Sequence, residues 1–276
     1  MIRGRRARRI ATALAAVIGL AYVLPLLWIV LTSLKTKTQV LKDPNALFFV
    51  PTLDTYADVI GDGLGAIITS VQIAALTTLV VVLVGVPAAF ALARRISDAW
   101  SRVIAVLLAV LLVLQMVPQP MTVIPLYSVL AGWKLLGTLP GLILADIALL
   151  LPFAIMLLRP FVLAIPPVLY EAAQLDGAST FQAFRSITVP MLTNGIVTVV
   201  SVVFISAWGE FVYAINFLPE GTVLPVSGLL ARQNSIYSAD WNSLMALAVL
   251  TSLPLLVVFA FTQRRLINGL TLGAVK

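Results

Sequence analysis

The feature that most constrains this chain is a series of long apolar runs without charged residues. The first run lies between Arg9 and Lys35 and holds 25 residues, Ile10 to Leu34. About 20 consecutive apolar residues cross the hydrocarbon core of a bilayer as a helix. Of the 276 residues, 61% are hydrophobic and 11% are charged, whereas about a quarter of a soluble domain is charged. The composition excludes a water-soluble globule and predicts a polytopic membrane protein.

Six such runs predict an all-α protein with six transmembrane helices. The predicted spans cover residues 10–34, 67–93, 103–127, 139–162, 193–218 and 241–263. The first run is longer than the apolar core of a cleaved signal peptide, so we expect it to be retained. No low-complexity linker or short repeat divides the sequence. We therefore expect one transmembrane domain over residues 1–276.

Basic residues are unevenly distributed between the predicted loops. With the N-terminus inside, the inner segments hold thirteen of them and the outer segments hold five. This excess predicts that both termini lie on the inner, cytoplasmic side of the membrane. Loops 35–66 and 219–240 are then outside and segment 165–190 is inside. Because the basic residues mark orientation, the net charge of +7 does not indicate a nucleic-acid partner.

The residue types that are missing exclude several kinds of chemistry. The chain has no Cys and no His, so disulfides, thiol catalysis and His-ligated metal sites are not available to it. None of the five lysines stands in the Gly-Lys-Ser/Thr pattern of a phosphate-binding loop. We expect no catalytic residue, no metal site and no bound cofactor in this chain, so that any nucleotide is bound by another chain.

The inner segment 165–190 is too polar to cross the bilayer and predicts a local structure of its own. Pro166 and Pro167 suit the first turn of a helix, and Gly177 is the residue type that ends a helix in the left-handed conformation. Between them, apolar residues recur at helical spacing: Val168, Ala172 and Leu175. The pattern predicts a short helix followed by a glycine turn.

A second short helix is predicted directly after this turn. Ser179 and Gln182 match a capping box, and Pro190 is expected to stop the helix. One face of it is lined by Phe181, Phe184 and Ile187. An amphipathic loop that lies on lipid is the alternative interpretation of this segment.

The spacing within this segment resembles the signature of permease subunits of bacterial ATP-binding-cassette (ABC) importers. That signature is Glu-Ala-Ala, three residues, Gly, nine residues, and Ile-x-Leu-Pro. The chain has Glu171, Ala172 and Ala173, then Gly177, then Ile187 to Pro190, with Val189 in place of the usual Leu. The resemblance implies the type I importer permease fold, with an ATPase-coupling role for Glu171, Ala172, Ala173, Asp176, Gly177, Ile187 and Pro190.

Three further segments resemble carbohydrate-importer permeases. They are the tail 263–276, the first span around Pro25 and Trp28, and residues 208–211, where Gly209 replaces the Asn of the family pattern. The likeness is closest to the smaller permease half of maltose-type importers. It implies import of an oligosaccharide, amino sugar or polyol. A glycerol-phosphate derivative is the alternative substrate.

The resemblance also implies a set of partners. They are a second permease subunit that forms a heterodimer with this chain, two copies of a cytoplasmic ATPase that holds ATP and Mg, and an extracytoplasmic solute-binding protein. The resemblance further implies that the chain lies in the inner membrane of a bacterial cell, where membrane lipid surrounds its spans. The chain itself is then not an enzyme.

Two acids lie inside predicted spans, Asp146 and Glu210. An ionised acid at mid-bilayer costs about 2.5 to 3.5 kcal/mol, so neither is expected to face lipid. A pathway role and a structural role are both open. The possible translocation-pathway residues are Gln115, Gln119, Asp146, Trp208, Glu210 and Asn216. The prolines Pro118, Pro120 and Pro125 are expected to break up the third span.

The outer loop 219–240 begins with apolar residues that need a place to bury. The resemblance implies that it projects toward the binding protein through Ser227, Gly228, Leu229, Leu230 and Ala231. Folding back onto the outer ends of the spans is the alternative.

Two other protein classes use acids in the membrane. An ion-coupled secondary transporter would use them as coupling sites, and a membrane-embedded enzyme would use Asp146 and Glu210 as an acid pair. Neither class explains the spacing from Glu171 to Pro190.

Overall fold

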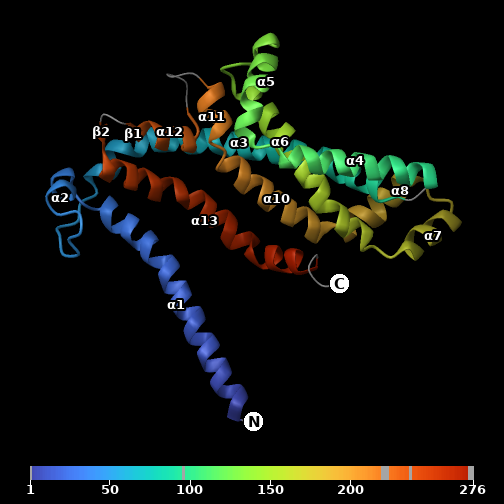
Figure 1. Cartoon of the computed structure of the whole chain (residues 1–276), viewed down its shortest axis with the longest axis horizontal. Helices are drawn as coiled ribbons and strands as arrows, with labels where there is room; N and C mark the ends of the chain where they lie inside the picture. Colours follow the sequence, from blue (N-terminus) through green and yellow to red (C-terminus); the bar gives the residue numbers. More distant parts are fainter. Residues whose placement is uncertain (1, 95–96, 219–223, 236–237, 273–276) are drawn as a thin grey trace. The chain divides into compact units, whose positions relative to one another are not determined.

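The computed structural model describes residues 2–94, 97–218, 224–235 and 238–272. Helices make up nearly all of this part of the chain, which confirms the predicted all-α architecture. Within the described ranges, the departure is a pair of antiparallel two-residue strands, β1 (Asn234–Ser235) and β2 (Ser238–Ala239). The helices, shown in Figure 1, are α1 (Ile2–Ser33), α2 (Lys37–Lys42), α3 (Asp54–Ala93), α4 (Asp98–Met116), α5 (Gln119–Gly132), α6 (Leu139–Leu163), α7 (Pro167–Leu175), α8 (Thr180–Ala183), the π-helix η1 (Phe184–Thr188), α9 (Val189–Met191), α10 (Thr193–Trp208), α11 (Val212–Phe217), α12 (Val226–Gln233) and α13 (Trp241–Leu272).

Five of the described helices are long and apolar enough to cross a membrane. They are α3, α4, α6 and the segments Ala11–Ser33 of α1 and Trp241–Gln263 of α13. A sixth crossing results if Thr180–Met191 and Thr193–Trp208, which meet at 71°, count as one bent span. The number then agrees with the six predicted spans. Residues 219–223 and 236–237 of the predicted outer loop, and Lys276 at the C-terminus, lie outside the described residues.

The second span is longer than the sequence indicates. The predicted span 67–93 extends back to Asp54, so that α3 has 40 residues. Asp54, Asp58 and Asp62 recur every four residues and therefore share one face of the helix. All three are exposed. Their charges, which indicated a loop, instead form the solvent face of the first turns.

The predicted third span, 103–127, consists of two helices. α4 ends at Met116 and α5 begins at Gln119. Val117 precedes a proline and is extended, with φ −70° and ψ 119°, as expected for a residue in that position. Pro118 follows with φ −59° and ψ 129°. The chain is therefore broken at Pro118, inside the predicted span.

The predicted fifth span, 193–218, is also divided. α10 ends at Trp208 with Gly209 as its C-cap, and α11 begins at Val212. The connecting residues include Glu210, so this acid lies at a helix break. A helix break exposes backbone N–H groups that need acceptors.

The chain forms two compact units, and unit 1 comprises residues 1–64 and 229–253. In this unit, the loop after α1 packs around the side chain of Lys35, which is 1% exposed. The Lys35 ammonium donates a 2.7 Å hydrogen bond to the Pro44 carbonyl. It also lies over the rings of Trp28 and Phe49, at 5.5 and 5.2 Å from their centroids. These contacts fix the C-terminal end of α1 to the loop that follows.

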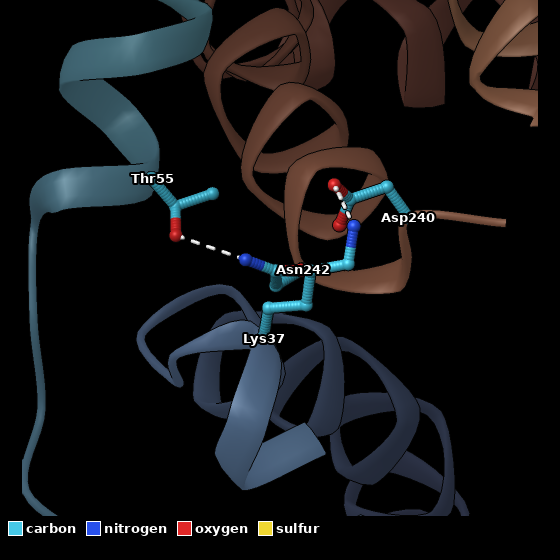
Figure 2. A network of polar contacts seen from close by, with 4 residues as sticks. All are labelled: Lys37, Thr55, Asp240 and Asn242. Atoms are coloured by element: carbon cyan, nitrogen blue, oxygen red, sulfur yellow. Dashed lines mark hydrogen bonds and ion pairs between the residues drawn. The ribbon is translucent and has the colours of Figure 1, made fainter. Parts of the chain in front are cut away.

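Polar contacts also join the starts of α3 and α13 in unit 1. Figure 2 shows Asn242 donating a 3.1 Å hydrogen bond to the Thr55 hydroxyl, and Lys37 paired with Asp240 at 3.3 Å. Further along, a Cβ on Gly63 would lie 2.6 Å from a methyl group of Leu250. The absence of a side chain at Gly63 thus lets the two helices approach closely.

Unit 2 comprises residues 65–228 and 254–276. In it, α6 packs against α4 and α10, and α11 packs against α5 and α6. The core includes Ile73, Leu142 and the stacked rings of Tyr213 and Phe217, whose centroids are 5.1 Å apart. α7 and α8 lie together at one end of this unit, away from α5 and α11 (Figure 1).

Candidate functional site

The predicted helix–turn–helix is present as residues 166–191, here called the 166–191 hairpin. Its first helix, α7, begins after Pro166 and has Pro167 in its first turn. Gly177 has φ +76°. Ala178 N–H donates to the Ala173 carbonyl at 2.8 Å, and Gly177 N–H donates to the Gln174 carbonyl at 3.0 Å. These two bonds form a Schellman motif, which requires a left-handed residue at position 177.

The second half of the hairpin starts with the predicted capping box. Ser179 Oγ accepts from Gln182 N–H at 3.2 Å, and Gln182 Oε1 accepts from Ser179 N–H at 2.7 Å.

The prediction that Pro190 stops the second helix is wrong, because the chain remains helical through Met191 and bends at Leu192. Proline in a regular helix clashes with the carbonyl four residues earlier. Here the preceding turn is the π-helix η1, in which Val189 N–H bonds to the Phe184 carbonyl five residues back. The wider turn accommodates the proline.

Aromatic and polar contacts hold the hairpin on the end of α3. The Phe90 ring lies 5.1 Å from the Phe184 ring and 6.2 Å from the Tyr170 ring. The Tyr170 hydroxyl lies 2.9 Å from the Thr188 hydroxyl and joins the two halves of the hairpin. Arg94 donates a 3.2 Å hydrogen bond to the Thr180 hydroxyl. The hairpin is therefore fixed to a transmembrane helix.

The residues of the importer signature lie mainly on the outer surface of this hairpin. Ala173 and Ile187 are half-buried, and the others are exposed: Glu171, Ala172, Asp176, Gly177 and Pro190. Two of the apolar residues predicted to share a face of α7 have little cover from the part of the chain that the structure describes: Val168 is 62% exposed and Leu175 is 89% exposed. In the second half, Phe184 packs inward while Phe181 is exposed.

A cleft of about 500 Å³ lies between the hairpin and the ends of α3 and α6. Its polar side chains are Arg94, Tyr170, Glu171, Gln174 and Thr180. The sequence predicted a role for Glu171 alone among these. Arg94 and Thr180 are 86 residues apart, so no local pattern could indicate that they meet.

Among the possible pathway residues, the structure brings Gln119 and Glu210 together. Gln119 Nε2 donates to Glu210 Oε1 at 2.7 Å. The same carboxylate accepts from the backbone N–H groups of Tyr213, at 2.7 Å, and Ala214, at 2.9 Å. Glu210 therefore caps α11 and joins it to the start of α5. The Tyr213 hydroxyl in turn lies 2.5 Å from the Thr122 hydroxyl of α5.

The other possible pathway residues form no hydrogen bond with the Gln119 and Glu210 side chains. Asp146 is 0% exposed, and neither of its carboxylate oxygens has a hydrogen-bond partner among the described residues. Trp208 is 3% exposed and stacks on Phe204. Gln115 donates to the Leu149 carbonyl at 3.2 Å, and Asn216 donates to the Val212 carbonyl at 2.7 Å.

The segment predicted to reach the binding protein lies in helix α12. Val226 is buried, and its N–H donates to the Ser70 hydroxyl at 2.9 Å. The Ser227 hydroxyl donates to the Glu210 carbonyl at 2.5 Å. Gly228 and Leu229 are buried, and Leu230 and Ala231 are half-buried. The start of this helix thus packs on its own chain in the conformation described.

Comparison with known proteins places these features in a family. The family described as binding-protein-dependent transport system inner membrane component matches residues 82–271. The trehalose transport system permease protein SugB of Mycobacterium tuberculosis is 36% identical over 99% of this chain and 98% of the relative. The diacetylchitobiose uptake system permease protein DasC of Streptomyces coelicolor is 32% identical over 96% and 95%.

One further relative and one solved structure are also similar to this chain. The sulfoquinovosyl glycerol transport system permease protein SmoH of Agrobacterium fabrum is 31% identical over 99% of this chain and 94% of the relative. A chain in the crystal structure of a bacterial ABC transporter involved in the import of the acidic polysaccharide alginate has a TM-score of 0.65 and 16% identity, covering 94% of each chain, which shows a shared fold. The resemblance based on the spacing from Glu171 to Pro190 is confirmed: this multi-pass inner-membrane chain belongs to the permease subunits of binding-protein-dependent ABC importers.

Proposed function

We propose that the 166–191 hairpin is the surface on which a cytoplasmic ATPase docks to drive transport. The main supporting observation is that α7 leaves Leu175 and Val168 exposed although the helix is held by the Tyr170–Thr188 contact and by the capping bonds after its C-terminal end. An apolar helix face fixed in this way suits a hydrophobic groove of a partner protein. A helix lying on lipid would have Lys or Arg on its polar face, whereas α7 has none.

The hairpin is continuous with two transmembrane helices. α6 precedes it, and α10 follows it after the bend at Leu192. These helices pack closely, since a Cβ on Gly195 would lie 2.8 Å from the Phe161 ring. Movement of the hairpin would therefore displace α6 and α10 together as a rigid body. α10 ends two residues before Glu210, so the displacement would reach the contact between Glu210 and Gln119.

The same proposal includes the partners of the chain. It pairs with a second permease subunit as a heterodimer, two copies of the ATPase bind ATP and Mg, and an extracytoplasmic binding protein delivers the substrate. This chain binds no cofactor and catalyses no reaction. The proposal is supported by family membership and by the sequence, which has no phosphate-binding loop, no Cys and no His.

The proposed substrate is a saccharide, either a disaccharide, an amino sugar oligomer or a glycoside. Its support is that relatives aligned over nearly the whole chain are named for transport of trehalose, diacetylchitobiose and sulfoquinovosyl glycerol. We assign Gln119 and Glu210 to the wall of the pathway. We further propose that residues 227–231 of α12 move toward the binding protein when the permease opens outward.

Uptake by the reconstituted transporter tests this function. Proteoliposomes would contain both permease subunits and the ATPase, with binding protein outside and labelled trehalose or diacetylchitobiose as substrate. Uptake of one of these sugars should require ATP inside and binding protein outside. Uptake driven by a proton or sodium gradient without ATP would contradict the proposal. A matched preparation with an inactive ATPase is the control.

A further inference from the structure

The cleft between the 166–191 hairpin and the ends of α3 and α6 has the size and lining of a small-molecule site. Ligand pockets of proteins are typically about 300 to 1,000 Å³, with mainly apolar walls and a few polar groups, and this cleft is about 500 Å³. Its buried part is formed by Phe90, Val162 and Ile165. Glu171, Gln174 and Thr180 at the cleft are exposed in this chain.

The polar side chains offer both donors and acceptors. Arg94 is held in place by the Phe90 ring, 5.6 Å away, and by its bond to Thr180. Its guanidinium has five N–H donors, and the bond to Thr180 uses one. Glu171 supplies a carboxylate that only accepts, and Arg94 and Glu171 form no ion pair with each other. Gln174 can both donate and accept.

This combination favours a neutral polyhydroxylated ligand. Hydroxyl groups can donate to the carboxylate and accept from the guanidinium, while the rings of Phe90 and Tyr170 provide apolar faces for the C–H groups of a sugar ring. A phosphate or an anionic lipid headgroup would meet Arg94 but would be repelled by Glu171, because like charges in an interface are unfavourable.

We propose that this cleft is a cytoplasmic saccharide site through which imported sugar slows its own transport. A sugar bound there would bridge Arg94 at the end of α3 and Gln174 of α7. It would thereby hold the hairpin against the transmembrane helices and oppose the movement that couples it to ATP hydrolysis. The identity of the sugar as the imported substrate rests on the proposed function above, whereas the existence of a saccharide site does not.

Two variants remove polar contacts from the cleft. They are Arg94→Leu and Gln174→Leu, and Gln174→Leu leaves the contacts of Arg94 with Phe90 and Thr180 in place. Arg102→Leu is the matched control, since Arg102 is an exposed arginine that does not line the cleft. Binding of trehalose, diacetylchitobiose and inorganic phosphate to the complete detergent-solubilised transporter would be measured without binding protein, and uptake would be measured with each sugar preloaded inside proteoliposomes.

One of the two sugars should bind and should inhibit uptake from inside. Each cleft variant should weaken this inhibition about tenfold, since loss of one hydrogen bond to a charged or polar group has roughly that effect. Arg102→Leu should behave as the wild type. The inference is overturned if neither sugar binds, if phosphate binds more tightly than both, or if inhibition persists unchanged in Gln174→Leu. Uptake by unloaded proteoliposomes reports on the proposed function separately.

Discussion

The Tyr170 hydroxyl lies 2.9 Å from the Thr188 hydroxyl, and Thr188 is 0% exposed. This bond joins α7 to the end of η1 and thus links the two halves of the 166–191 hairpin. We expect Tyr170→Phe and Thr188→Val each to destabilise the hairpin by about 1 kcal/mol, with a coupling energy of similar size between them. A double-mutant cycle on thermal unfolding of the purified transporter measures the coupling. Strictly additive effects would show that the two hydroxyls do not interact.

Glu210 should be important for stability because three donors converge on it. Glu210→Ala would leave Gln119 Nε2 and the N–H groups of Tyr213 and Ala214 without their acceptor. Each buried donor left unsatisfied costs about 1 to 3 kcal/mol. The two backbone N–H groups are the buried donors, so we expect a loss of roughly 2 to 6 kcal/mol, measured by thermal unfolding in detergent. Asp58→Asn, which alters an exposed acid of α3, is the control and should change little. An unchanged midpoint for Glu210→Ala would contradict the capping role.

We expect replacement of Asp146 to raise thermal stability, in contrast to replacement of Glu210. Its carboxylate is fully buried without a hydrogen bond to any described residue, and burying an unpaired ionisable group is costly. A leucine of similar branched shape has no polar atom to leave unpaired, so we expect Asp146→Leu to raise the midpoint of thermal unfolding by about 2 to 4 °C. A lower midpoint, with Asp58→Asn unchanged, would show that Asp146 has a stabilising partner in the assembled transporter.

The orientation of the chain can be tested by cysteine labelling, because the sequence contains no Cys. We expect Asp54→Cys and Lys134→Cys to react with a membrane-impermeant maleimide added to intact spheroplasts. Asp176→Cys should react only after the membrane is opened, since the basic residues place segment 165–190 inside. Labelling of Asp176→Cys in intact spheroplasts would reverse the predicted orientation.

Local features of the hairpin could be predicted from the sequence because their partners are near neighbours. Ser179 and Gln182 are three residues apart in the sequence. Gly177, whose N–H donates to the Gln174 carbonyl, is also three residues from its partner. The end of the second helix was predicted wrongly at Pro190, because the π-helix that accommodates this proline has no clear sequence pattern. The prolines at 118, 120 and 125 correctly predicted that the third span is interrupted. Because the residues after Pro118 are also apolar, however, hydropathy could not show that a separate helix, α5, begins at Gln119.

Contacts between distant segments could not be predicted. Gln119 and Glu210 are 91 residues apart, and their meeting depends on the packing of α11 against α5 and α6. The same holds for the Arg94–Thr180 contact that borders the cleft. Hydropathy and spacing determine which residues enter the membrane and which helices form. They do not determine which polar side chains meet once those helices pack.

The central claim is that the ATPase docks on the 166–191 hairpin, and Gly177 offers the sharpest test. Its φ of +76° is forbidden to proline, and proline would also remove the N–H that bonds to Gln174. Asparagine tolerates this conformation, and a Cβ at position 177 would meet no atom within 4 Å. Gly177→Asn is therefore the matched control for Gly177→Pro.

The measurement is the amount of ATPase that copurifies with the tagged permease pair in each variant. We expect Gly177→Pro to insert and to pair with the second permease subunit as the wild type does, but to lose most of the bound ATPase and to abolish uptake. Gly177→Asn should retain both. Full ATPase attachment and normal uptake in Gly177→Pro would contradict the proposed docking site.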